Sequence, residues 1–107
     1  MPVYVDNMRA SYGRMKMCHL LADSMTELFE MADRIGVARK WFQPLSHPHF
    51  DIALSKKALA IQAGAIEVDR HGIVEVMKRY RARLDTDAAE RVIFNLAISG
   101  RYTDERR

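Results

Sequence analysis

Apolar positions near the start of the chain follow the patterns of β-strands. Residues 3–6 (VYVD) are β-branched and aromatic and lead into a polar segment, NMRASYG, which predicts a strand followed by a turn. Residues 15–22 (MKMCHLLA) are mostly apolar on both alternating sets, a pattern typical of a central strand covered on both faces. Residues 65–69 (AIEVD) predict a third strand, and residues 39–42 (RKWF) a fourth with a less regular pattern.

Helix signals lie between these strands. Residues 23–36 (DSMTELFEMADRIG) carry Ser24 as a predicted N-cap, with a glutamate three positions on, which is a capping box. Gly36 can end this helix in the left-handed conformation. Residues 54–64 (LSKKALAIQAG) predict a helix of about two turns, with Ser55 as its N-cap.

The C-terminal third predicts two further helices. In residues 72–84 (GIVEVMKRYRARL) the apolar positions recur at steps of four, three and four. Residues 85–100 (DTDAAERVIFNLAISG) follow, with Asp87 opening a second capping box. Together they predict a helical hairpin, and we expect the final residues, 101–107, to be mobile.

The order of these elements predicts an α+β fold, a small α/β-like structure in which helices cover a short mixed sheet. We expect an α/β core domain in residues 1–69. Residues 70–107 would form the helical hairpin, packed on that domain or extending it. A chain of 107 residues is long enough for one hydrophobic core.

Composition narrows the class of protein further. Hydrophobic residues make up 49% and charged residues 29% of the chain, values ordinary for a globular domain. No apolar run reaches the 18 or more residues of a membrane span, and the N-terminus lacks the pattern of a signal peptide. A single cysteine, Cys18, fits a reducing compartment and the core of the fold. We therefore expect a cytoplasmic protein without a membrane partner.

The net charge of +3 is concentrated in residues 70–107. Four cations lie within six positions there, at Lys78, Arg79, Arg81 and Arg83, with an aromatic residue among them. A solvated helix face explains this cluster better than a nucleic-acid contact does, because the basic excess is slight.

Residues 41–51 (WFQPLSHPHFD) hold the most conspicuous polar cluster. His47, His49 and Asp51 form H-x-H-x-D, whose side chains share one face if the segment is extended. Imidazole and carboxylate together suit zinc, manganese or iron. Known folds that use this pattern need larger scaffolds and further ligands. The sequence therefore favours a proline-fixed loop in which Asp51 bonds backbone amides, and no residue is assigned as a metal ligand.

His19 lies within the apolar strand at residues 15–22. A neutral, hydrogen-bonded core histidine is the favoured interpretation. The functional alternative is a general acid or base whose tautomer is fixed by Asp6, Asp23 or Asp51. On that alternative the candidate catalytic residues are His19, His49 and Asp51.

Candidate ligand-binding residues surround these positions, because ligands bind such sheets where strands end and loops begin. Arg9 follows the first strand, and Lys56 lies at a predicted helix N-terminus, where amides and the dipole favour an anion. Trp41 can stack on a base or another ring. Asp6 and Asp23 each follow a strand and complete the rim.

Several segments also resemble a known family. VYVDNMR, CHLLAD, ELFEMADRIG, WFQ, HFD and SKKALAIQAGA, over about residues 3–66, resemble small bacterial and phage-borne proteins catalogued only as a domain of unknown function. Two departures are Asn7, where the family pattern has an acidic residue, and Phe50, where it has Tyr. The first would weaken a two-carboxylate metal site at Asp6.

The resemblance implies a shared site and a phage or prophage connection, but no known activity. The implied site residues are Asp6, Arg9, His19, Asp23, Trp41, Gln43, His49 and Asp51.

Three hypotheses for function follow. The first is a pocket for a phosphorylated small ligand, such as a nucleotide or a nucleic-acid end, with metal-assisted hydrolysis. The second is a non-enzymatic phage accessory protein that sequesters a ligand or inhibits a host defence protein. The third is a weak nucleic-acid binder that uses residues 78–83. The sequence leaves the cofactor open, and the C-terminal helices are a candidate homodimer contact.

Overall fold

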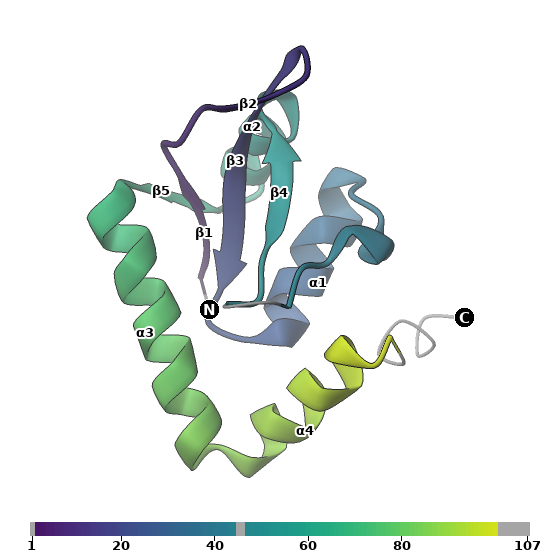
Figure 1. The fold of residues 1–107 in the computed structure, drawn as a ribbon, viewed down its shortest axis with the longest axis vertical. Helices are drawn as coiled ribbons and strands as arrows, with labels where there is room; N and C mark the ends of the chain where they lie inside the picture. Colours follow the sequence, from purple (N-terminus) through teal and green to yellow (C-terminus); the bar gives the residue numbers. More distant parts are fainter. Residues whose placement is uncertain (1, 45–46, 101–107) are drawn as a thin grey trace.

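A mixed β-sheet with helices on both faces forms the body of the protein (Figure 1). The computed structural model describes residues 2–44 and 47–100. In chain order the elements are β1 (Val3–Asp6), β2 (Ala10–Tyr12), β3 (Met15–Ala22), α1 (Met25–Ile35), the 3-10 helix η1 (Arg39–Trp41), β4 (Phe50–Ala53), α2 (Leu54–Gln62), β5 (Ile66–Val68), α3 (Arg70–Thr86) and α4 (Ala88–Ile98). The predicted α+β fold with C-terminal helices is confirmed.

β3 is the central strand of the sheet. It pairs antiparallel with β1 and β2 along one side and with β4 along the other. β5 pairs parallel with β1 at the outer edge, which makes the sheet mixed. The polar segments that follow β1 and precede β4 therefore both lie next to β3.

A bulge interrupts the side of the sheet formed by β1 and β2. Pairing of β1 ends at Val5 opposite Leu20, and pairing of β2 begins at Ala10 opposite Met17. Four residues, 6–9, therefore face only two residues of β3. Bulges of this kind bend a strand and redirect its side chains, and they are frequent beside functional sites.

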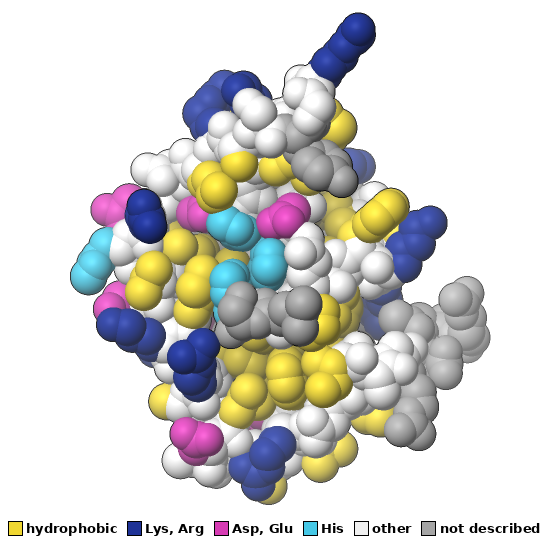
Figure 2. Space-filling model, in the orientation of Figure 1, with side chains coloured by type: hydrophobic (Ala, Val, Ile, Leu, Met, Phe, Trp, Pro, Cys, Tyr) yellow, Lys and Arg dark blue, Asp and Glu magenta, His cyan; other side chains and the backbone are white. Residues whose placement is uncertain are grey.

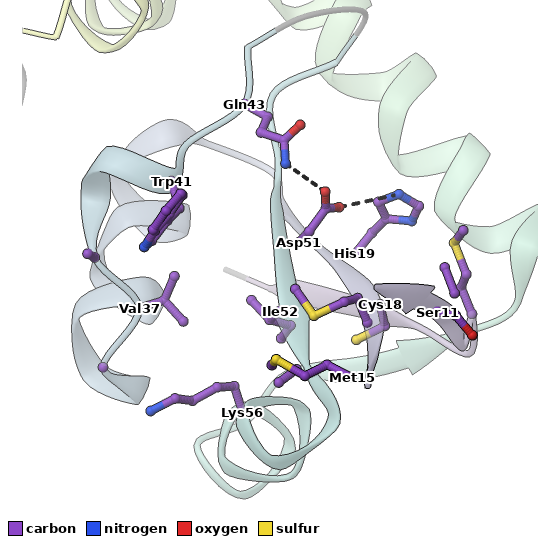
Figure 3. A pocket seen from close by; sticks show the side chains of 16 residues that line it. Ser11, Met15, Cys18, His19, Val37, Trp41, Gln43, Asp51, Ile52 and Lys56 are labelled. Atoms are coloured by element: carbon purple, nitrogen blue, oxygen red, sulfur yellow. Dashed lines mark hydrogen bonds and ion pairs between the residues drawn. The ribbon is translucent and has the colours of Figure 1, made fainter. Parts of the chain in front are cut away.

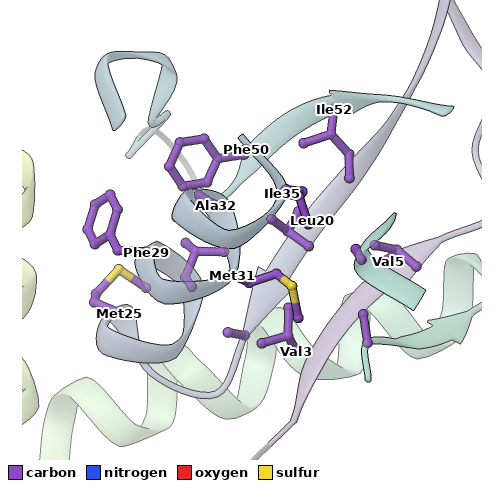
Figure 4. Close-up of a cluster of buried hydrophobic side chains, with 14 of the residues drawn as sticks. Val3, Val5, Leu20, Met25, Phe29, Met31, Ala32, Ile35, Phe50 and Ile52 are labelled. Carbon is purple, nitrogen blue, oxygen red and sulfur yellow. The ribbon is translucent and has the colours of Figure 1, made fainter. Parts of the chain in front are cut away.

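β1 and β3 bury side chains on both faces because alternate residues of a strand point to opposite sides. On one face Val5 and Leu20 pack with Phe29 of α1 and Phe50 of β4 (Figure 4). On the other face β1 and β3 pack against α3 in a second cluster, formed by Tyr4, Leu21, Ile73 and Val76. The central position predicted for residues 15–22 is confirmed, but burial on both faces holds for residues 20–22, whereas Met15 and Lys16 are exposed.

The predicted helix ends are largely confirmed. The Ser24 side chain accepts a hydrogen bond from the backbone N–H of Glu27 at 3.2 Å, and Gly36 adopts φ 80° at the C-terminus of α1. Asp87 is the N-cap of α4. α3 begins at Arg70, two residues before the predicted start, because the side chain of Asp69 caps it.

Three local predictions are wrong. Residues 39–42 do not form a strand, because 39–41 form the single turn η1. Ser55 is not an N-cap, because α2 begins at Leu54 directly after β4 without a side-chain cap. The predicted loop ends early, because Phe50 and Asp51 belong to β4. Buried Phe50 and Ile52 hold this short strand against β3, a constraint that its own sequence does not reveal.

α3 and α4 meet at Asp87 and diverge like the arms of a V (Figure 1). α3 packs on β1 and β3, whereas α4 packs on α1 and α3. Among residues 2–44 and 47–100, no helix has both the length and the apolar character needed to cross a membrane. The mobility expected for residues 101–107 lies outside the described residues, and the domain division at residue 70 stays a prediction.

Glu90 joins three helices at one buried point. Its carboxylate, 3% exposed as a residue, accepts hydrogen bonds from the backbone N–H of Met25 at 2.9 Å and from the hydroxyl of Tyr80 at 2.6 Å. Arg83 lies 3.6 Å from its other oxygen. Burial, followed by the hydrogen bond to Glu90, raises the pKa of Tyr80, so this hydroxyl stays a donor. Glu90 thus attaches α3 and α4 to the start of α1.

We predict that Glu90→Ala lowers the free energy of unfolding by about 3 kcal/mol, because it leaves two buried donors, the N–H of Met25 and the hydroxyl of Tyr80, without their acceptor. Urea denaturation measures the loss. Glu75→Ala is the matched control, since Glu75 and Lys78 form a solvent-exposed pair at 3.8 Å whose loss costs less than about 1 kcal/mol. Equal losses in the two variants would contradict the anchoring role of Glu90.

Candidate functional site

Three polar side chains form a row across β1, β3 and β4. The His19 ring lies between two carboxylates: Nδ1 is 2.7 Å from Oδ2 of Asp6, and Nε2 is 3.7 Å from Oδ1 of Asp51. Asp51 is the direct cross-strand partner of His19. His49, two residues earlier, shares the face of Asp51, and its Nε2 lies 3.2 Å from the same oxygen. The structure thus brings His19, His49 and Asp51, the three candidate catalytic residues, into contact.

Asp6 anchors the row from the bulge. Its side chain is 4% exposed and also accepts hydrogen bonds from the backbone N–H groups of His19 at 3.0 Å and Met8 at 3.3 Å. Burial acts to raise the pKa of Asp6, but the hydrogen bonds from the ring and backbone of His19 outweigh it. The pKa is held below 3.8. Asp6 is therefore an ionised, buried acceptor at neutral pH.

The pKa of His19 shifts in the opposite direction to that of Asp6. The hydrogen bond to Asp6 raises its pKa above 6.5, burial opposes the rise, and the charges of Asp6 and Asp51 add to it. Because Nδ1–H donates its hydrogen bond to the carboxylate of Asp6, the neutral ring carries its lone pair on Nε2. The reactive nitrogen of His19 therefore faces Asp51 and the solvent side.

His47 completes a group of three imidazoles. Its ring stacks on that of His49, with centroids 4.5 Å apart and planes at 27°, and its backbone carbonyl lies 3.0 Å from Nδ1 of His49. Burial, followed by the charges of His49 and His19, lowers the pKa of His47 to about 4. Figure 2 shows histidine side chains gathered at the centre of one face, next to acidic side chains.

Gln43 orients Asp51 from the neighbouring segment. Its backbone exchanges two hydrogen bonds with His49, of 2.9 and 3.0 Å, in an isolated antiparallel bridge. This bridge directs the Gln43 amide to Asp51, where Nε2 donates to Oδ2 at 2.6 Å (Figure 3). Oδ1 of Asp51 is left to face the imidazoles.

A pocket of about 760 Å³ runs along β4, a size suited to a small-molecule ligand. In the view of Figure 3, Val37 and Trp41 lie on one side of β4 and His19 on the other. Trp41 is 61% exposed, and Lys56 supplies a cation. The apolar lining includes Met8, Met15, Met17, Val37 and Ile52.

Seven of the nine candidate residues lie at or next to the pocket, and two lie elsewhere. His19, Trp41, Gln43, Asp51 and Lys56 line the pocket, while Asp6 and His49 contact residues that line it.

Arg9 and Asp23 lie apart from this group. Arg9 is exposed and is not among the residues that line the pocket. Asp23 accepts hydrogen bonds from Tyr4 at 3.2 Å and Arg79 at 3.1 Å, on the side of the sheet covered by α3. Of the three aspartates considered as partners of His19, Asp6 and Asp51 contact its ring, and Asp23 belongs to a different cluster.

Sequence reasoning did not select His47 or the methionines. His47 was part of the H-x-H-x-D pattern, but it lies outside β4, and its stacking on His49 becomes visible only in the structure. Met8 and Met15 gave no signal, because they reach the pocket only through the bulge and the β2–β3 turn. Burial raises the pKa of Cys18 to about 11, so this pocket-lining thiol stays protonated, consistent with its predicted place in the core.

The arrangement suits proton transfer or metal binding. Each of His19, His47 and His49 offers a ligand atom, and these atoms lie within 4.8 Å of one another. A neutral imidazole whose second nitrogen is held by a carboxylate is equipped to accept a proton from water or to bind a metal ion.

Fold and site together define a class: an α+β protein with a histidine and carboxylate cluster at the wall of a pocket. The chain belongs to the family described as "Protein of unknown function (DUF4031)", whose model matches residues 3–80. This match confirms the resemblance to a family of unknown function and extends beyond residue 66 into α3. Neither the curated proteins nor the solved structures contain a match to the chain.

We predict that Asp6→Asn lowers the pKa of His19 in metal-free protein, because the amide keeps the shape of the carboxylate without its charge. NMR titration of the ring measures the shift. Asp85→Asn, at an exposed position of α3, is the control and should leave this pKa unchanged.

The same substitution should change stability with a defined pH dependence. The contribution of His19 is complete below its unfolded pKa, about 6.5, and is lost as pH rises through its higher folded pKa. The contribution of Asp6 is complete above 3.8 and is lost as pH falls through its lower folded pKa. The difference between wild type and Asp6→Asn should therefore be largest between about pH 4 and 6.5. A difference that does not vary with pH would contradict the charged pair.

Proposed function

We propose that the protein binds a small phosphorylated ligand with a planar ring, such as a nucleotide or a nucleic-acid end, and hydrolyses it. The observation that carries this proposal is the pocket along β4, which combines Trp41 and Lys56 with the Asp6–His19–Asp51 row. The family match gives no activity, so the proposal rests on the chemistry of this pocket.

The pocket lining supports binding of a ring and a phosphate. Trp41 exposes most of its surface, and indole stacking on a base is worth about 1–3 kcal/mol. Thioethers of Met8 and Met15 add polarisable apolar surface. Lys56 offers an ammonium group as a phosphate partner, whereas Lys57 is engaged with Glu67 at 2.6 Å.

The histidine cluster supports hydrolysis. His19 and Asp51 line the same pocket, and Nε2 of His19 is the nitrogen available to take a proton from water. The Asp6 carboxylate fixes the tautomer and orientation of the ring. The cluster thus supplies a group that activates water beside the bound ligand.

Binding of nucleic acid along α3 is less well supported. Arg79 pairs with Asp23 at 3.1 Å, Arg83 with Asp87 at 3.1 Å, and Lys78 with Glu75 at 3.8 Å. These internal partners reduce the positive field that a polyanion would meet. Neutralising the basic residues of α3 should accordingly have little effect on retention by DNA.

Partner binding remains a separate hypothesis. Val92 is 60% exposed and Ile98 47% exposed on α4, and they are the apolar side chains that a second copy or a host protein would cover. A cytoplasmic location and a phage connection stay predictions from the sequence and from the resemblance. Ligand binding without turnover would favour sequestration over catalysis.

The test begins with binding. Trp41 is the single tryptophan, so quenching of its fluorescence by mononucleotides reports occupation of the pocket directly. A ligand at about one hundred times its Kd should raise the Tm by roughly 10 °C. Lys56→Met should weaken binding about tenfold or more, since a charge-assisted hydrogen bond is worth about 1.5–3 kcal/mol. Lys78→Met, which removes a surface lysine from α3, should bind like wild type.

Turnover is measured on the same ligands by release of phosphate or of a cleaved base. Activity that disappears in His49→Ala while binding persists supports hydrolysis at the histidine cluster. If no mononucleotide or short oligonucleotide quenches Trp41 or raises the Tm, the proposed ligand class is wrong.

A further inference from the structure

From the geometry of the cluster we infer that His19, His49 and Asp51 bind a divalent transition metal of the zinc class, with His47 as an additional imidazole. Nε2 of His19 and Nε2 of His49 lie 3.7 and 3.2 Å from the same oxygen, Oδ1 of Asp51. Tetrahedral zinc, with bonds of about 2.0–2.2 Å, places neighbouring donor atoms roughly 3.3–3.6 Å apart. Two of the three separations among these atoms are thus close to those between neighbouring ligands of one ion. The ligand atoms of His19, His47 and His49 lie within 4.8 Å of one another.

The hydrogen bonds behind the two rings determine where their protons are. Nδ1 of His19 donates to the ionised carboxylate of Asp6 at 2.7 Å. Nδ1 of His49 is 3.0 Å from the carbonyl oxygen of His47, which can only accept. In a neutral imidazole the remaining nitrogen carries a lone pair. Both Nε2 atoms therefore carry a lone pair, and both lie within 3.7 Å of the same carboxylate oxygen of Asp51.

Three acceptors that face one another need a cation between them. A single proton on one ring can satisfy one of the two Nε2–Oδ1 contacts and leaves the other ring with its lone pair against the carboxylate. The cost is appreciable because His49 is only 9% exposed and His19 23% exposed. A divalent metal satisfies all three acceptors at once and neutralises the negative charges of Asp6 and Asp51.

The outer contacts match those of known metal sites. Histidine ligands usually donate their second N–H to a carboxylate or a backbone carbonyl, and ligating carboxylates are hydrogen-bonded in turn. Here Asp6 holds His19, the His47 carbonyl holds His49, and Gln43 donates to Oδ2 of Asp51 at 2.6 Å. Each proposed ligand thus has the orienting partner that such sites require.

The donor set indicates which metals fit. Two or three imidazoles with one carboxylate favour zinc, iron or manganese, whereas magnesium and calcium prefer sites built from oxygen atoms. His19 and Asp51 also line the pocket, so a further coordination position would face the bound ligand. The use of the metal in hydrolysis rests on the proposed function, but its binding does not.

The experiment measures metal binding by the full-length chain without an affinity tag, after treatment with EDTA. Co²⁺ is added while the visible absorption bands of tetrahedral cobalt are recorded, and Zn²⁺ is then titrated in competition. We expect one equivalent to bind and Zn²⁺ to displace Co²⁺. The Tm of the metal-free protein should rise with Zn²⁺ because the ion binds the folded state.

Variants identify the ligands. Asp51→Asn and His49→Ala should weaken binding by at least tenfold, and Gln43→Ala, which removes only an orienting group, by about 10- to 100-fold. Asp51→Asn is nearly isosteric, so it tests the site even if His49→Ala fails to fold. His71→Ala is the matched control, because His71 is an exposed histidine of α3.

The outcomes are distinct. Retention of wild-type affinity in both Asp51→Asn and Gln43→Ala would overturn the metal site, as would loss of binding in His71→Ala alone or absence of saturable binding. A proton, not a metal, would then occupy the cluster. Metal binding without any effect of nucleotides on Trp41 fluorescence would refute only the proposed function. Nucleotide binding together with wild-type metal affinity in both Asp51→Asn and Gln43→Ala would refute only the metal site.

Discussion

The rest of the site depends on the hydrogen bonds that the carboxylate of Asp6 accepts. This carboxylate is a buried anion placed where β1 leaves β3, and it accepts the ring N–H and the backbone N–H of His19 as well as the N–H of Met8. In this position it accepts backbone N–H groups that would pair with carbonyl groups of a neighbouring strand in a regular sheet. The strand can therefore bulge without leaving these N–H groups unpaired. A single side chain thereby fixes both the path of the strand and the orientation of the imidazole.

The register of β4 on β3 supplies the other half of the site. Phe50 and Ile52 are fully buried in the core, and the residues between and before them, Asp51 and His49, consequently face the row. A shift of one residue would exchange these two sets of side chains. Packing on the apolar face therefore positions the polar groups on the opposite face. Mutations of these core residues would accordingly displace the side chains of the histidine cluster.

Local signals were sufficient for part of this structure. The capping serine at Ser24, the left-handed Gly36 and the doubly apolar pattern of β3 depend on neighbours within a few residues, and sequence reasoning found them. β2 and β4 are short, and pairing with β3 holds them in place, so the same reasoning missed them. The spacing of His49 and Asp51 indicated a shared face, but the choice among Asp6, Asp23 and Asp51 as partners of His19 required the registers of both sides of β3.

β4 passes into α2 without an intervening loop, since Ala53 ends the strand and Leu54 begins the helix. Asp51 and Lys56 are therefore carried by one continuous backbone segment, which fixes the positions of their Cα atoms relative to each other. Trp41, by contrast, is carried by the single turn η1 between α1 and β4. For the proposed ligand, adjustment to its size would accordingly come from the indole side of the pocket, which a single helical turn carries, and not from the backbone that carries Asp51 and Lys56.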